Sequence, residues 1–264
     1  PFYHSKKDNF LFNFLSKLLA FLEKMAVRRF SSGIDLVVTY DHEKELNAKE
    51  LGLSVVVMGI PVDYEKFFAP VKNNISKDQQ VILLSVGALS PFRRFEDTIS
   101  AAVILKNKGY KIKVLIICKD YWKDALYREQ FENFIEKSGI KSNIEARFNG
   151  ANEEELLKLI KNSHIFVFPS NIKIWGMTVL EAMAAGLPAV IADCTSVADI
   201  LVDGENSLKF STQNPVEIAD CIQELIDNPA FYERIAKRGQ AYVKENLNWG
   251  RYVENIIKHA TTIS

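Results

Sequence analysis

Residues 171–188, which read NIKIWGMTVLEAMAAGLP, decide the fold of this chain. They follow a short apolar run at residues 164–168, and they end in glycine, leucine and proline, an order that stops a helix. The alanine-rich segment 177–185 is therefore predicted to be a helix that opens directly after Gly176. One carboxylate, Glu181, lies a single turn inside this apolar helix, and one lysine, Lys173, precedes it. A strand, a loop and a helix in this order predict one unit of a parallel sheet.

The same alternation of strand and helix extends over most of the chain. We predict strands at residues 34–40, 55–58, 81–86, 113–118, 144–148, 164–168 and 189–192, and helices at 8–30, 41–51, 95–108, 121–138, 152–162, 177–185, 196–201, 215–227, 229–246 and 249–260. Strands that alternate with helices of about ten residues or more favour an α/β fold with a Rossmann-like, doubly wound parallel sheet. Such sheets bind ligands at the carboxyl ends of their strands.

The composition is that of a globular protein without net charge. The 264 residues include 33 basic and 33 acidic side chains, so no global field favours nucleic acid. The three cysteines are scattered and lack metal-binding spacing, so we expect free thiols in a reducing, cytoplasmic compartment. No Asp-x-Asp motif occurs, and neither a metal nor a cofactor is expected. The longest apolar stretch, residues 10–30, is interrupted by charges and is not expected to span a bilayer.

The start of the helix at 177–185 has the chemistry of an anion site. Its first backbone N–H groups, those of Met177, Thr178 and Val179, have no partner within the helix and carry the positive end of its dipole. Gly176 has no side chain to block a phosphate from approaching them. Glu181 follows about one turn later, where a carboxylate suits the two vicinal hydroxyls of a ribose. This spacing indicates a nucleotide, although a local pairing role for Glu181 in a purely structural helix stays open.

The segment also resembles the signature of the retaining glycosyltransferases of the GT-B fold, family 4, also called group 1. That signature has a glutamate, then Phe-Gly, four residues, and Glu-Ala-Met-Ala-x-Gly-x-Pro. Here Trp175 and Gly176 take the place of Phe-Gly, and residues 181–188 match the remainder. The resemblance implies that Glu181 binds the nucleotide ribose. The glutamate that contacts the donor sugar in the family corresponds to Lys173, which is a departure.

Other family positions follow in order along the chain. Gly87 resembles the glycine at the strand end where the family has Gly-Arg-Leu, with Ala88 in place of the arginine. Arg93 and Arg94 stand where the family has a lysine and a glycine, so Arg93 is the implied diphosphate cation and Arg94 a compensating one. Residues 150–151, Gly150 followed by alanine (Ala151), resemble the loop that meets the nucleobase. The family's Gly-x-Gly is absent, since residues 118–120 read Cys-Lys-Asp.

The resemblance implies three parts: residues 1–58 as the tail of an N-terminal, acceptor-side domain, 59–246 as the nucleotide-sugar domain, and 247–264 as a helix crossing back to the first. The chain begins at Pro1 without a signal-peptide pattern, which suggests a fragment of a longer protein. Residues 2–5 resemble the family's histidine segment, which assigns His4 to the donor sugar. The alternative is that His4 is simply an exposed terminal residue.

The implied activity is transfer of a sugar from a UDP- or GDP-sugar to an unidentified acceptor hydroxyl, on a glycan or a lipid, with retained configuration and without a metal. The implied catalytic residues are His4, Arg93 and Glu181. Lys173 is hypothesised to meet the donor diphosphate or an acidic donor sugar, or else to be solvated. Two alternatives remain, a non-catalytic nucleotide-sugar-binding subunit and another GT-B enzyme such as an epimerase. The basic, apolar helix at 8–30 is expected to pack in the core, and peripheral membrane contact stays open.

Overall fold

The computed structural model describes residues 22, 25, 35–38, 54–57, 60–72 and 75–262. The chain divides into two compact units, residues 1–58 and 59–264, and each is described by itself. In the first unit, β1 (Asp35–Val38) and β2 (Ser54–Val57) pair in parallel, with Asp35 opposite Ser54. These strands coincide with two of the predicted β-branched runs. His4, the helix at 41–51 and all but two residues of the helix at 8–30 lie outside the described residues.

The second unit is built on a six-stranded sheet of order β5-β4-β3-β6-β7-β8. Its strands are β3 (Val81–Ala88), β4 (Ile112–Lys119), β5 (Ile144–Arg147), β6 (Ile165–Phe168), β7 (Ala189–Ala192) and β8 (Leu208–Phe210), and all neighbours pair in parallel. The strands read as continuous apolar runs because helices cover both faces. The strand order changes direction between β3 and β6, which makes their carboxyl ends the expected ligand site.

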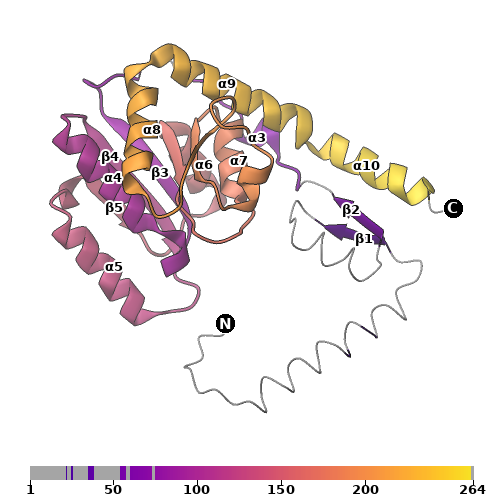
Figure 1. Ribbon diagram of the computed structural model, residues 1–264, viewed down its shortest axis with the longest axis horizontal. Coiled ribbons are helices and arrows are strands. Elements are labelled where there is room, and N and C mark those ends of the chain that lie inside the picture. Colours follow the sequence, from indigo (N-terminus) through magenta and orange to yellow (C-terminus); the bar gives the residue numbers. More distant parts are fainter. Residues whose placement is uncertain are drawn as a thin grey trace. The chain divides into compact units, whose positions relative to one another are not determined.

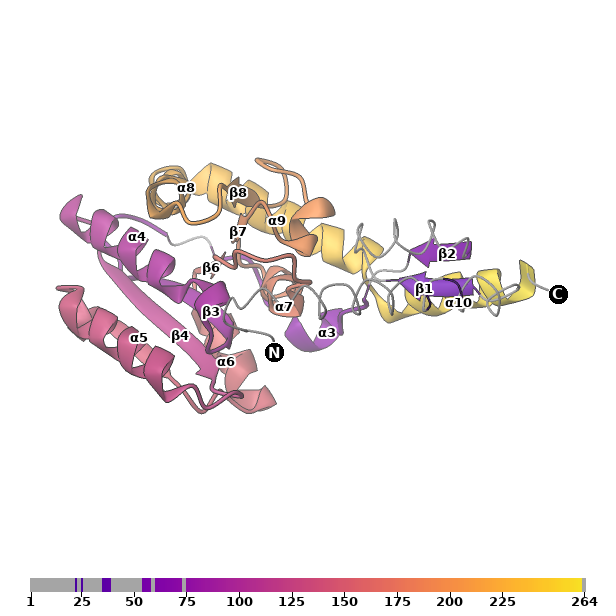
Figure 2. The same ribbon diagram turned by 60° about the horizontal axis from the view of Figure 1, so that its bottom comes forward.

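Helices flank this sheet on both sides, as Figures 1 and 2 show. The helices of this unit are α3 (Tyr64–Phe67), α4 (Phe95–Asn107), α5 (Ala125–Lys137), α6 (Glu153–Asn162), α7 (Met177–Ala184), α8 (Pro215–Asp227), α9 (Pro229–Asn246) and α10 (Trp249–Thr262), with short 3₁₀ turns at η1 (Pro91–Arg93), η2 (Lys141–Asn143) and η3 (Ser196–Asp199). Of these, α10 extends away from the sheet. Helix α4 packs against α8, and α7 packs against α9. The predicted doubly wound α/β fold is confirmed.

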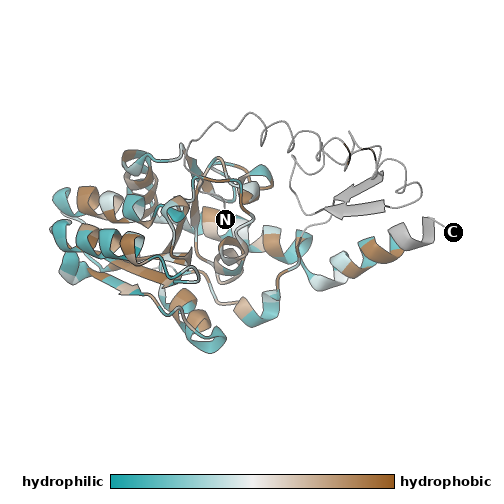
Figure 3. Cartoon of the chain, turned by 90° about the horizontal axis from the view of Figure 1, so that it is seen from below, coloured by the Kyte–Doolittle hydropathy of each residue, from teal (hydrophilic) through white to brown (hydrophobic). Residues whose placement is uncertain are grey.

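The main core lies between the sheet and α4, α5 and α8. Leu105, Phe131 and Ile222 of these helices are fully buried in it, together with the apolar side chains of the strands. Figure 3 shows the corresponding pattern, with apolar residues along the strands and polar residues on the outer faces of the helices. This burial is the main driving force for folding of the second unit.

Short polar caps fix where several helices begin. Helix α5 begins at Ala125, four residues later than predicted, because the Asp124 carboxylate accepts a hydrogen bond from the Tyr127 backbone N–H at 3.0 Å. Asn152 and Glu155 form a reciprocal capping box at the start of α6. Sequence patterns missed β8 and α3, which have three and four residues and are too short to show a period.

In the second unit, the segment near its start contacts the residue that follows α9. The Val62 backbone N–H donates to the Leu247 carbonyl at 2.7 Å, so residues 185 positions apart in sequence are neighbours in space. The three cysteines are unpaired, as predicted. Within the described segments, no helix is both long and apolar enough to cross a membrane.

Candidate functional site

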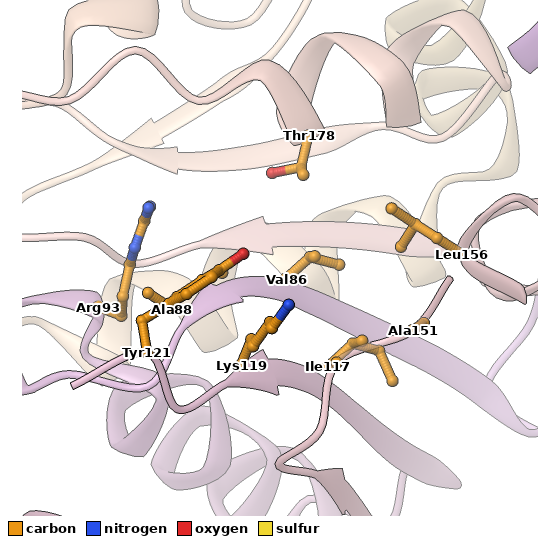
Figure 4. A pocket seen from close by; sticks show the side chains of 11 residues that line it. Val86, Ala88, Arg93, Ile117, Lys119, Tyr121, Ala151, Leu156 and Thr178 are labelled. Carbon is orange, nitrogen blue, oxygen red and sulfur yellow. The ribbon is translucent and has the colours of Figure 1, made fainter. Parts of the chain in front are cut away.

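A cavity of about 330 Å³ lies at the carboxyl ends of β3 and β4, beside the start of α7. Five residues predicted for the site line it: Gly87, Arg93, Gly150, Ala151 and Thr178. Figure 4 shows Thr178 on one wall, with the side chains of Arg93 and Lys119 reaching toward it from the opposite side. The strand-end position expected of a doubly wound sheet is therefore where the predicted residues meet.

The loop after β3 holds Arg93 in place through backbone contacts. The Arg93 N–H donates to the Ser90 carbonyl at 3.0 Å within η1. The neighbouring Phe92 carbonyl accepts two hydrogen bonds from the loop after β6, one from the Ser170 hydroxyl at 3.1 Å and one from the Asn171 N–H at 3.0 Å. The loops that follow β3 and β6 are thereby tied together at the point where the strand order reverses.

The Arg93 side chain is half-buried, and its guanidinium has no countercharge among the described residues. Its Nε is enclosed and has no hydrogen-bond partner, and burial lowers the pKa of the group. No carboxylate in the described part of the chain forms an ion pair with it. A Cβ atom on Gly87 would lie 3.1 Å from this Nε, so the glycine leaves the room that the guanidinium occupies. Such a group is suited to receive an anion, because an unpaired, partly buried charge is costly.

Arg94 is committed to a structural role instead. Its backbone is left-handed, with φ of 53°, and its guanidinium donates to both oxygens of the buried Asp97 at 3.0 and 2.7 Å. These hydrogen bonds raise the pKa of Arg94. The residue caps the start of α4 and does not line the cavity. The expectation that Arg94 is a second diphosphate cation stays a prediction, and the Asp97 pair does not favour it.

Helix α7 opens toward the cavity with two free N–H groups rather than three. Gly176 has φ of +49°, and a Cβ atom there would lie 3.0 Å from both Phe168 and Val179, so the position requires glycine. The N–H groups of Met177 and Thr178 have no acceptor among the described residues. The N–H of Val179 donates to the Gly176 carbonyl at 2.9 Å, which corrects its assignment as a phosphate donor.

Glu181 lies one turn further along α7 and is half-buried, outside the lining of the cavity. Burial raises the pKa of its carboxyl group, the charge of Glu153 adds to this effect, and Lys66 opposes it. Lys66 itself pairs with Glu153. The Glu181 carboxylate has no hydrogen-bond or ion-pair partner within the described segments, so its oxygens are available to hydroxyl donors.

Lys173 forms an ion pair that the sequence analysis did not anticipate, and its role toward the donor stays a prediction. Its ammonium group pairs with Asp199 of η3 at 2.5 Å, and the two side chains are 34% and 38% exposed. The adjacent Ile174 carbonyl accepts a hydrogen bond from the Ser196 N–H at 3.0 Å. Lys173 does not line the cavity. In this arrangement it neutralises a carboxylate of the loop after β7.

The sequence analysis missed the apolar side chains of Val86, Ile117 and Leu156 in the cavity lining. It also missed two polar ones, Lys119 at the end of β4 and Tyr121 just after it. Lys119 is the register partner of Ala88 in the parallel pair β3–β4. Its ammonium group lies 5.0 Å from the centre of the Tyr121 ring, an arrangement that favours a cation. Its position directly after the predicted strand at 113–118, at the carboxyl end where ligands bind, is the signal that could have identified it.

The cavity has a basic end and an apolar end. Arg93, Lys119 and the start of α7 supply positive charge, whereas Ile117, Ala151 and Leu156 line the opposite end in Figure 4. An elongated ligand with an anionic part and a flat, less polar part fits this division. No group of three or more His, Cys, Asp and Glu side chains is placed to hold a metal within the residues that the structure describes.

The family model described as "Glycosyl transferases group 1" matches residues 67–242, which is more than half of the chain. An uncharacterized glycosyltransferase of Methanocaldococcus jannaschii is 25% identical over 255 residues, covering 93% of this chain and 63% of that protein. Alpha-D-kanosaminyltransferase of Streptomyces kanamyceticus is 26% identical over 176 residues, covering 66% of this chain and 44% of that protein. The chain thus spans less than two thirds of the length of these curated relatives.

The fold is also that of solved glycosyltransferase structures. HepE of Anabaena, in complex with UDP-glucose, superposes with a TM-score of 0.73 at 16% identity, covering 86% of this chain and 64% of that one. The family model and the strand-end geometry agree, and the chain is a member of the group 1 glycosyltransferases, with the GT-B type of α/β fold.

Proposed function

We propose that this chain carries the donor-binding half of a retaining, metal-independent glycosyltransferase that uses a UDP- or GDP-sugar. One observation carries the proposal: the half-buried Arg93, which has no countercharge, and Thr178 at the start of α7 line one cavity with an apolar far end. A nucleoside diphosphate has the matching order of charge and flat ring. The UDP-glucose complex of HepE, a protein of the same fold, supports this choice of ligand.

In this proposal the diphosphate lies between Arg93 and Thr178, and the nucleobase lies toward Ala151 and Leu156. Glu181 then accepts hydrogen bonds from the ribose hydroxyls. The helix N-terminus and the guanidinium both favour the diphosphate over a neutral group, because each presents positive charge in a partly water-excluded site. The family's donor-sugar role for His4 stays a prediction, since that residue lies outside the described segments.

During transfer, the bond between the anomeric carbon and the diphosphate oxygen breaks, and the diphosphate leaves with the electron pair. The acceptor oxygen forms the new bond on the same face of the sugar, and its proton passes to an oxygen of the leaving diphosphate. Negative charge therefore grows on the phosphate groups that Arg93 and the start of α7 face. Donors fixed at the place where charge develops lower the barrier.

A non-catalytic nucleotide-sugar-binding subunit is the second candidate. The observation that favours it is the Lys173–Asp199 pair, which places a neutralised side chain where the family has a glutamate at the donor sugar. Both candidates bind a nucleotide, and only the first releases diphosphate from the donor. An assay of donor hydrolysis and transfer separates them.

The test of donor binding is calorimetric titration of the full chain with UDP, GDP, ADP and the UDP- and GDP-sugars. We expect one nucleotide class to bind and Glu181→Ala to lower its affinity by about tenfold, as loss of hydrogen bonds to a carboxylate implies. Glu154→Ala is the matched control, because that exposed carboxylate pairs only with Lys158 on the outside of α6. If none of these nucleotides binds the unaltered chain, the proposal is overturned.

A further inference from the structure

The backbone around Lys119 is fixed from both sides. On one side the Leu89 N–H donates to the Lys119 carbonyl at 2.9 Å, and Lys119 forms the last rung of the β3–β4 ladder opposite Ala88. On the other side Lys119 forms a bridge with Asn149, and the Gly150 N–H donates to the Cys118 carbonyl at 2.9 Å. The residue therefore ends a strand that cannot shift without disturbing both neighbours.

The Lys119 side chain reaches over the cavity from this anchored position. Figure 4 shows its ammonium group between Arg93 and the apolar end, on the side opposite Thr178. The register partner Ala88 has only a methyl group, so no longer side chain competes for the space next to Lys119. The aliphatic stem runs past Gly150, where an added Cβ would lie 3.5 Å from it.

The charge of Lys119 is not used within the described part of the protein. It forms no ion pair or side-chain hydrogen bond there, and its contact is with the Tyr121 ring. Lys113 on the same strand behaves differently, because it pairs with Glu145 at 2.8 Å. Two lysines of one strand thus differ in whether they form an ion pair with a carboxylate, and the lysine without such a pair lines the cavity.

We propose that Lys119 is a second phosphate-binding residue of the donor and binds the phosphate nearer the nucleoside, while Arg93 binds the farther one. This inference rests on the proposed function. A cavity with two cations at successive positions and no carboxylate in its lining matches two successive phosphates. The lysine is supplied by β4, next to a β3 position that carries no charge. In the reaction, the diphosphate that leaves with the electron pair is then held by both cations and by α7.

The experiment compares nucleoside diphosphates with their monophosphates by calorimetry on the full chain. For whichever of UDP and GDP binds, we expect Lys119→Met to weaken the diphosphate and the corresponding monophosphate by a similar factor of about ten. Lys119→Arg, which keeps the charge, is expected to stay within about threefold of the unaltered chain. Arg93→Met is expected to weaken the diphosphate far more than the monophosphate. Lys113→Met is the matched control and is expected to bind both like the unaltered chain.

The outcomes separate this inference from the function on which it rests. If the unaltered chain binds a nucleoside diphosphate and Lys119→Met binds it equally well, Lys119 is a solvated lysine and the inference is wrong. A loss confined to the diphosphate also overturns the assignment to the nearer phosphate. If the unaltered chain binds neither diphosphate, the proposed function itself fails. Thermal unfolding of each variant, expected to be unchanged for an exposed side chain, verifies that the fold is intact.

Discussion

The loops after β3 and β6 lie at the same strand-end site, and each carries a positive side chain. The two side chains differ in whether they form an ion pair. The loop at residues 89–94 leaves the half-buried Arg93 guanidinium without a carboxylate partner. In the loop at residues 169–176, Lys173 forms an ion pair with Asp199. The two loops are joined by hydrogen bonds to the Phe92 carbonyl. Both charges were candidates for the donor from sequence, and their partners separate them.

This difference shows that the availability of a charge matters more than its presence near a site. A partly buried cation without a countercharge destabilises the protein until an anion arrives. A cation that already has a carboxylate must give up that pair before it binds a ligand. Arg93 is therefore poised for binding, whereas Lys173 mainly fixes the loop to η3. The four predictions that follow test this contrast, beginning with the largest expected effect.

Arg93→Met tests the unpaired charge directly. We expect nucleoside diphosphate affinity to fall about 100-fold, since hydrogen bonds to charged groups contribute roughly 1.5–3 kcal/mol each. Stability is expected to stay nearly constant, because the variant removes a partly desolvated charge and also its contacts with the rings of Phe92 and Phe168. Calorimetry and thermal unfolding measure the two effects. Arg94→Met is the control, with opposite behaviour: unchanged affinity and a lower melting temperature from loss of the Asp97 pair. Equal binding losses in both variants would contradict the contrast.

Gly176→Ala tests the backbone of the second loop. A side chain at φ of +49°, within 3.0 Å of Phe168 and Val179, is expected to destabilise the fold by about 1–3 kcal/mol. That corresponds to a melting temperature lower by at least about 2 °C. Gly204→Ala is a matched control, because its φ of +69° is similar but an added Cβ meets nothing within 4 Å. The Gly176 variant should lose clearly more stability than the control, and equal losses would show that contact with Phe168 is unimportant.

Glu181→Gln tests the ribose contact and has a defined pH dependence. Because burial raises the pKa of Glu181, its ionised form is disfavoured in the folded state. The carboxylate therefore lowers stability at pH values above that pKa, and this penalty disappears as the pH falls through it. We expect the glutamine variant to be more stable at neutral pH, with the difference vanishing in acid.

Nucleotide affinity should follow the same titration. In the unaltered chain, affinity is expected to fall as the pH drops through the raised pKa of Glu181, because a protonated carboxyl accepts fewer hydrogen bonds. The glutamine variant should bind more weakly, by about tenfold or less, and its affinity should be flat over that range. Calorimetry from about pH 8 to about pH 4.5 measures both. A variant with the same pH profile as the unaltered chain would show that Glu181 does not contact the ligand.

Lys173→Met is expected to have the smallest effect. A half-exposed ion pair contributes about 0–1 kcal/mol, so stability and diphosphate affinity should change little. Asp199→Asn is the informative counterpart, because it removes the ion-pair partner of Lys173. The loop at residues 169–176 then carries an unpaired cation, as the loop at residues 89–94 does. Calorimetry should show a modest gain in diphosphate affinity for Asp199→Asn and none for Lys173→Met. A large loss of diphosphate affinity in Lys173→Met would show that Lys173 contacts the donor.

Local patterns predicted the sheet, the helices and the strand-end site. The run from Gly176 to Glu181 combined a helix start, a glycine and one carboxylate, so the position of α7 followed from short-range physics. Arg93 was identified from the resemblance to the family, because it stands where the family has a lysine. Very short elements such as β8 were missed, since three residues show no period.

The remaining errors concern partners that a single segment does not reveal. Lys173 depends on Asp199, which the fold brings to it from the loop after β7. Lys119 became visible through the register of β3 with β4. Arg94 is different, because its partner Asp97 is three residues away and an ion pair at that spacing could have been weighed from sequence. Burial and register decide the chemistry of these side chains, and both are properties of the fold.

The hydrogen bond between Val62 and Leu247 has a consequence for how such a protein can be assembled over evolution. A unit whose first and last residues are adjacent can be inserted into another chain, or exchanged between chains, with two junctions at one point. Residues 62–247 contain the complete sheet and the whole cavity. This segment is thus organised as a transferable module, which can be combined with different partner domains while its sheet and its cavity stay together.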